Sequence, residues 1–122
     1  MTRDELLAFH KVSCVEAHML MVAKNHDYAG ADGLTPFANF EACEKLGICS
    51  TETGMLVRMC DKFMRLVNFA KSGTLKVKDE SAHDTCLDLI NYAILFDAYR
   101  IGKESQCAES ATFQADTATG AL

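Results

Sequence analysis

The chain of 122 residues is long enough for one domain. It is 49% hydrophobic and has a single proline, a composition that suits a helical core. Seventeen acidic residues outnumber twelve basic ones and give a formal net charge of −5, which argues against broad nucleic-acid binding because such binding needs a basic surface. A small anion such as a nucleotide is still compatible with this charge, since it needs only a local cluster of basic side chains.

The six cysteines form no C-x-x-C pair, and several lie within helical patterns, where a free cysteine behaves as a small hydrophobic residue. We therefore expect a reduced protein without disulfides or a zinc site. The N-terminal sequence lacks the layout of a signal peptide, and no apolar run approaches the roughly 20 residues of a membrane span. The sequence thus predicts a cytoplasmic protein that does not cross a membrane.

A first helix is predicted from about residue 3 to about residue 25, because Thr2 and Glu5 have the spacing of a capping box. Its apolar residues recur at helical spacing and are expected to face the core. They are Leu7, Val12, Val15, Met19 and Val22.

Residues 25–33 are rich in turn formers and should end this helix. They place Asp27 and Tyr28 directly after Lys24. Composition leaves two interpretations open, a plain connecting loop or a loop that contacts a ligand.

A short second helix should start at Thr35 and Pro36 and end at Gly47. Phe37 and Phe40 share one face of it and are interpreted as core residues. Stacking of a phenylalanine on a nucleotide base is the alternative.

The third helix is predicted from residue 50 or 51 to about residue 71, and the fourth from residue 79 or 81 to Gly102. Residues 103–122 are small and polar and lack apolar periodicity, so we expect a flexible tail or an arm used in assembly. The sequence therefore predicts an all-α four-helix bundle in a single domain over residues 1–102.

One polar line runs along the fourth helix through Glu80, Asp84, Asp88 and Asn91, at spacings of four, four and three. At about 100° per residue these side chains lie within about 80° of one another. From Leu87 onward the helix is apolar nearly all round, so Asp88 should be buried. An ionised carboxylate in such a place needs a cation, an ion pair or several donors.

The third helix supplies basic side chains at matching spacing, Arg58, Lys62 and Arg65, with Asp61 beside them. Its other face is apolar and suits a helix packed on its neighbours. Acids facing bases on two helices permit interhelical salt bridges without function, or a site where carboxylates hold a divalent cation and bases hold phosphate. Spacing alone leaves both interpretations open.

Four segments together resemble the phage and bacterial family called nucleotide modification associated domain 1, which is similar to the MazG-like all-α NTP pyrophosphatases. The resemblance covers roughly residues 24–99. The segments are KNHDYA (24–29), PFANF (36–40), GMLVRMCDKFMRL (54–66) and KDESAHDTCLDLINYAIL (78–95).

The resemblance implies hydrolysis of nucleoside triphosphates or deoxynucleoside triphosphates to a monophosphate and pyrophosphate, with Mg²⁺ or Mn²⁺ neutralising phosphate charge. It implies roles for four groups of residues. Asp84 and Asp88 would be catalytic; Glu80, Asp84 and Asp88 would hold metal; Arg58, Lys62 and Lys24 would contact phosphate; Asp27, Tyr28 and Asn91 would face the nucleoside. Spacing on the third helix adds Asp61 to the metal group and Arg65 to the phosphate group, and the stacking alternative adds Phe40 to the nucleoside group.

The related pyrophosphatases carry a glutamate-rich E-E-x-x-E element on the first metal helix, whereas the third helix here supplies only Asp61. The alternative is a noncatalytic phage protein that binds or sequesters a nucleotide or cyclic nucleotide. The expected partners are a nucleotide ligand and further copies of the chain, in a homodimer or homotetramer whose site is completed near an interface. Neither nucleic acid nor a membrane is expected as a partner.

Overall fold

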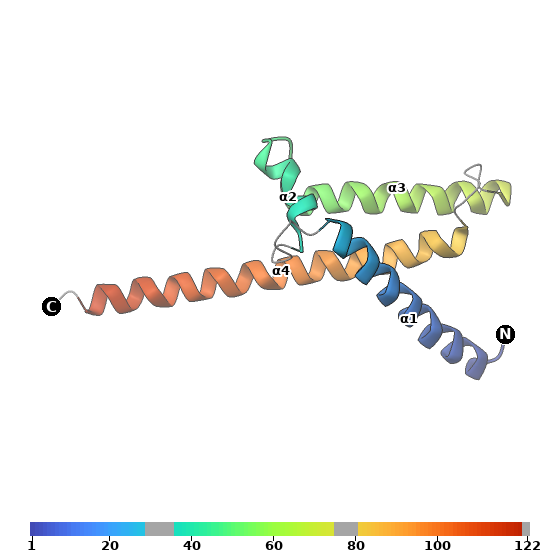
Figure 1. Ribbon diagram of the computed structural model, residues 1–122, viewed down its shortest axis with the longest axis horizontal. Coiled ribbons are helices and arrows are strands. Elements are labelled where there is room, and N and C mark those ends of the chain that lie inside the picture. The colour runs from blue at the N-terminus through green and yellow to red at the C-terminus, as the bar shows by residue number, and fades with distance from the viewer. Residues whose placement is uncertain (29–35, 75–80, 121–122) are drawn as a thin grey trace.

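The computed structural model describes residues 1–28, 36–74 and 81–120, which form four helices and no strand (Figure 1). The helices are α1 (Arg3–Tyr28), α2 (Ala38–Lys45), α3 (Thr51–Ser72) and α4 (Ala82–Thr119). The predicted all-α class with four helices is confirmed.

The long helix α4 is the element on which the chain is organised. In Figure 1, α3 runs beside the first half of α4 in the opposite direction, and α1 crosses that half at an angle. The short helix α2 packs at the start of α3. The second half of α4 extends away from the other three helices (Figure 1).

Local hydrogen bonds explain where α3 begins and ends. The Ser50 hydroxyl accepts from the backbone N–H of Thr53 at 3.1 Å, as an N-cap residue does. The Glu44 carboxylate accepts from the Thr51 hydroxyl at 2.6 Å and so joins α2 to the buried first turn of α3. Gly73 ends the helix with φ of 72°, a conformation that costs glycine little.

The prediction that the fourth helix ends at Gly102 is wrong, because α4 continues to residue 119. A glycine inside a helix costs only about 1 kcal/mol relative to alanine. Contacts around Gly102 oppose that cost. Arg100 donates to Glu104 at 2.6 Å, and Lys103 donates to Glu52 of α3 at 2.9 Å. A role of residues 103–122 in assembly stays a prediction.

The buried interior is small and unusually polar. Its hydrophobic members are Ala17, Phe40, Met55 and Leu87. Its polar members are Ser13, Thr51, Thr85, Asp88 and Asn91. The first half of α4 therefore meets its neighbours largely through polar and small side chains.

The predicted core face of α1 is wrong, because its large apolar side chains point away from α4. Val15 is 54% exposed and Met19 is 67% exposed. On α3, Leu56 and Phe63 are likewise exposed, at 50% and 59%. A helical apolar stripe indicates that a face is covered, yet it does not say by what.

By length and composition alone, the segment Arg3–His26 of α1 could cross a membrane, with a mean hydropathy of 1.3 over its best window. Signal sequences and the core helices of soluble proteins share this property. The cytoplasmic location expected from the sequence stays a prediction.

Candidate anion-binding pocket

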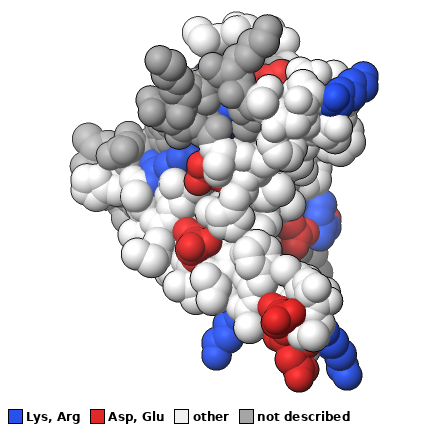
Figure 2. Space-filling model, turned by 90° about the vertical axis from the view of Figure 1, so that its right-hand side faces the viewer, with Lys and Arg blue, Asp and Glu red and all other residues white. Residues whose placement is uncertain are grey.

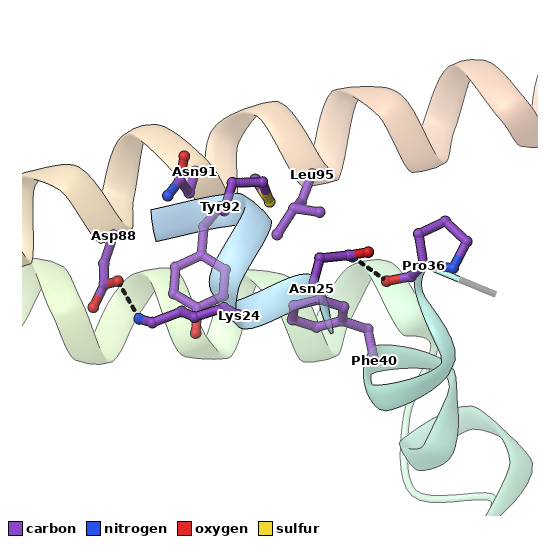
Figure 3. Close-up of a pocket in the computed structure, with 9 residues that line it drawn as sticks. Lys24, Asn25, Pro36, Phe40, Asp88, Asn91, Tyr92 and Leu95 are labelled. Carbon is purple, nitrogen blue, oxygen red and sulfur yellow. Dashed lines mark hydrogen bonds and ion pairs between the residues drawn. The ribbon is translucent and has the colours of Figure 1, made fainter. Parts of the chain in front are cut away.

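A pocket of about 440 Å³ of empty space, its open mouth included, lies where α1, α2 and α4 meet (Figure 3). Helical spacing explains its lining, because α1 and α4 each contribute side chains three or four residues apart. The lining residues are Met21, Lys24, Asn25, Pro36, Phe40, Asp88, Asn91, Tyr92 and Leu95.

Asp88 lies at one end of this pocket, held between lysines from two other helices. Its Oδ1 accepts from the Lys24 ammonium at 2.6 Å, and its Oδ2 accepts from the Lys62 ammonium at 2.8 Å. The Asp88 side chain is 8% exposed, and that of Lys62 is 18% exposed. The Lys24 side chain is 44% exposed. Helices α1, α3 and α4 thus converge on one carboxylate, whose burial agrees with the sequence prediction.

The two lysines keep Asp88 ionised. Burial by itself would raise the pKa of this carboxyl. Hydrogen bonds from Lys24 and Lys62 and the positive charges of both lysines outweigh burial, so the pKa of Asp88 lies below its ordinary value. Asp88 is therefore a carboxylate at neutral pH.

Aromatic rings form another wall of the pocket. The rings of Phe40 and Tyr92 meet edge to face, with centroids 6.1 Å apart. The guanidinium carbon of Arg58 lies 5.5 Å from the centroid of Phe40, within the range of a cation–π contact. Phe40 is buried, as expected for a core residue, and it also lines the pocket.

Two amide side chains brace the walls. Asn91 is buried, and its Nδ2 donates to the backbone carbonyl of Ala17 at 2.9 Å, which ties α4 to α1. Asn25 donates to the backbone carbonyl of Pro36 at 3.2 Å and holds the segment before α2 against α1. Figure 3 shows the latter contact at the pocket edge opposite Asp88. The nucleoside contact expected of Asn91 stays a prediction.

Asp84 does not line the pocket, although it shares a helix face with Asp88. Its Oδ2 accepts from the backbone N–H and hydroxyl of Ser81 at 2.8 Å and 2.7 Å, so it completes a capping box at the start of α4. These hydrogen bonds from Ser81 lower the pKa of Asp84. The sequence signal for this role is Ser81 three residues before Asp84.

The other predicted site residues divide into two groups. Asp61, which is exposed, and Arg65, which is half-buried, lie on α3 and do not line the pocket. The side chains of Glu80, Asp27 and Tyr28 lie outside the described residues. Sequence reasoning missed Met21, Asn25, Tyr92 and Leu95. Met21 lies three residues before Lys24, and Tyr92 lies four after Asp88. Asn25 lies four residues after Met21, and Leu95 lies four after Asn91, so helical spacing is the signal that could have found them.

The described donors do not form a Mg²⁺ site. Both oxygens of Asp88 hold ammonium groups, and Asp84 is engaged by Ser81. Across residues 1–28, 36–74 and 81–120, no three His, Cys, Asp or Glu side chains lie close enough together to hold a metal ion. We therefore derive no metal-dependent step from these residues, and Mg²⁺ or Mn²⁺ binding stays a prediction.

No protein-family model matches the chain, and no curated protein or solved structure is significantly similar to it. The resemblance to the MazG-like proteins stays a prediction. The fold and the pocket define the protein only as an all-α protein with an aromatic-walled pocket that has a lysine-bound carboxylate at one end.

Proposed function

We propose that the protein binds a nucleotide or a closely similar phosphorylated small molecule in this pocket without cleaving it. The observation that carries the proposal is the buried Asp88 clamped by Lys24 and Lys62 beside the rings of Phe40 and Tyr92. The lysines would contact phosphate, and the rings would contact the planar base.

Charge supports an anionic ligand. Among the described residues, the pocket lining and the side chains in contact with it include three cations, Lys24, Lys62 and Arg58, and one carboxylate, Asp88. Ammonium groups form charge-assisted hydrogen bonds to phosphate oxygens, about twice as strong as neutral ones. A partly buried cation cluster therefore favours a phosphate over an uncharged group.

Preorganisation supports the same ligand class. Asp88 holds both ammonium groups in place before a ligand arrives, which reduces the side-chain ordering that binding would otherwise require. A buried ion pair adds little stability by itself, so its position at a pocket favours a binding role.

Binding without cleavage is the function that the described side chains support best. Hydrolysis between phosphates would need metal ligands or a base near the phosphate. Asp88, the carboxylate at the pocket, has both oxygens occupied by ammonium groups. The binding experiment therefore also measures pyrophosphate release, which the pyrophosphohydrolase predicted from the resemblance would produce.

A thermal-shift panel tests the proposal on the full chain. Nucleoside mono-, di- and triphosphates, cyclic nucleotides and the parent nucleosides are each added with Mg²⁺ and with chelator. We expect phosphorylated compounds to raise the Tm in both conditions, as ligands that bind only the folded state do, and nucleosides to raise it much less. Pyrophosphate release that needs Mg²⁺ would support the hydrolase instead, and no shift with any phosphorylated compound would contradict binding.

Substitutions locate the site. Lys62→Met should remove most of the nucleotide-induced shift, because it deletes one of the two phosphate contacts. Lys45→Met is the matched control, since Lys45 is exposed on α2, lies 3.8 Å from Glu41 and does not line the pocket. Equal shifts in both variants would place the ligand elsewhere.

A further inference from the structure

Helix α1 has two dissimilar sides. The side against α4 is small and polar, with Ser13 at 7% and Ala17 at 2% exposed. The opposite side carries large apolar side chains that no described residue covers. They are Val12 at 55%, Val15 at 54%, Met19 at 67% and Val22 at 59% exposed.

Together with the exposed Ala8, these residues form a stripe at spacings of four, three, four and three. We name Ala8, Val12, Val15, Met19 and Val22 the α1 stripe. This alternation is the heptad pattern with which one helix packs along another. Figure 1 shows the first half of α1 projecting away from the other helices, so a second helix can approach it.

The side chains that flank the α1 stripe indicate which helix fits. Lys11 borders the stripe on one side and Glu16 on the other, five residues later. In a parallel helix pair, a side chain in the place of Lys11 faces the side chain five residues later on the partner helix. Opposite charges at these two places form interhelical salt bridges. Two copies of α1 side by side would therefore pair Lys11 with Glu16 twice.

Lipid fits this surface less well. A membrane-surface helix needs basic flanks to approach anionic headgroups, whereas Asp4 and Glu5 follow Arg3 in the first turn of α1 and give no basic cluster there. The chain as a whole carries a formal charge of −5. Figure 2 views the end of the molecule where α1 begins, and it shows acidic and basic side chains interspersed on a surface that is mostly uncharged.

We propose that two copies of this chain associate through the α1 stripe as a parallel helix pair. Burial of these apolar side chains drives the association. Lys24 lies on the α4 side of α1 and lines the pocket, so the α1 stripe is a separate surface from the ligand site. The dimer is therefore independent of the proposed nucleotide binding.

Light scattering coupled to size exclusion, over a series of protein concentrations, tests the proposal on the full chain. Wild type is expected to be a dimer. The double variant Val15→Lys with Met19→Lys should be monomeric at the same concentrations, because two ammonium groups per copy cannot be buried, and dimerisation should weaken at least about a hundredfold. Both positions are exposed in the protomer, so helix content by circular dichroism should not change.

A matched control and a charge exchange make the test specific. Phe113→Lys changes an exposed apolar residue on α4 and should leave the dimer intact. Lys11→Glu should weaken the dimer about fivefold, and adding Glu16→Lys should restore it. Glu16 also lies 2.9 Å from His83, an exposed contact of small energetic value, which circular dichroism monitors.

Several outcomes would overturn the proposal. A wild-type monomer at every concentration, or a dimer that survives the double lysine variant, would show that the α1 stripe is not the interface. Binding to vesicles of anionic phospholipid that the double variant abolishes, with wild type monomeric in their absence, would assign the surface to lipid. Failure of the charge exchange to restore a dimer weakened by Lys11→Glu would exclude the parallel arrangement.

Discussion

Asp88 shows how one residue can depend on three helices. Its carboxylate accepts one ammonium group on each oxygen, and each lysine comes from a different helix. Removing one partner of a buried ion pair leaves the other partner's charge desolvated, which commonly costs 3–5 kcal/mol. The side chain of Lys24 is almost half exposed, so water compensates part of that loss here.

Asp88→Asn should therefore lower the free energy of unfolding by about 3 kcal/mol, measured by urea denaturation followed by circular dichroism. Asp61→Asn is the matched control. Asp61 is exposed on α3, so its substitution should change stability by less than about 0.5 kcal/mol. Similar losses of unfolding free energy in the two variants would contradict a stabilising role for the contacts of Asp88 with Lys24 and Lys62.

The lowered pKa of Asp88 also predicts how the free energy of unfolding depends on pH. The pKa of Asp88 is lowered in the folded protein. Its contribution to stability is therefore fully present above the ordinary aspartate pKa of about 3.9 and is lost as pH falls through the lower folded value. Below that value, wild type and Asp88→Asn should have converging stabilities, and a constant difference down to the acid limit would contradict this reasoning.

At the scale of the element, α4 contains a glycine that sequence reasoning took for its end. Gly102 lies in the helix interior, and a Cβ added there would meet no atom within 4 Å. Turn-forming residues mark the end of a helix only where the residues after them cannot continue that helix. The small polar residues after Gly102 can continue a helix, which is why the predicted boundary is wrong.

Gly102→Ala should raise the free energy of unfolding by about 0.5–1 kcal/mol, because alanine restricts the unfolded chain and fits the helix. Gly73→Ala is the opposite control. Gly73 has φ of 72°, so alanine there should be destabilising by about 1 kcal/mol. Chemical denaturation of both variants checks the pair, and a destabilised Gly102→Ala would contradict a continuous α4.

For α3, the sequence predicted the polar side that faces α4 better than it predicted the burial of the apolar side. Helical spacing placed Lys62 toward the acid line of α4, and the structure confirms its contact with Asp88. The same spacing grouped Leu56 and Phe63 on an apolar face that the protomer leaves exposed. Periodicity separates two sides of a helix, but it cannot say whether the covering partner belongs to the same chain.

At the scale of the whole molecule, stability should be concentrated where α1 and α3 meet the first half of α4. Residues 104–118 are exposed throughout, and the hydroxyls of Ser110, Thr112 and Thr117 donate to backbone carbonyls of the same helix. The longest-range link near this segment is Lys103 with Glu52. The extended half of α4 therefore adds helix without adding to the interior.

A chain ending after Glu104 should keep its Tm within a few degrees of wild type while its helical circular dichroism falls in proportion to the residues removed. Thermal denaturation monitored by circular dichroism checks both quantities. A chain truncated within α1 is the contrasting variant, since it loses Ser13 and Ala17 from the interior. A large fall in Tm on removal of the arm alone would mean that assembly depends on it.

Sequence periodicity predicted the helical class, the burial of Asp88 and the basic side chain opposite it. It could not predict that Lys24 would reach Asp88 across 64 positions, because helix spacing says nothing about how α1 crosses α4. It also gave Asp84 to a ligand site, whereas Ser81 three residues earlier competes for it as a cap. The predicted site therefore differs from the pocket in the structure for two reasons. A local capping contact engages Asp84, and the way in which α1 crosses α4 brings Lys24 to Asp88.

Because the clamp draws Lys24, Lys62 and Asp88 from three distant stretches of chain, it exists only after those stretches have docked. An isolated fragment can coil into helices yet lack any place for a phosphate. Occupancy of the pocket would thus report completed tertiary assembly, so a bound nucleotide would select mature molecules from partly folded ones.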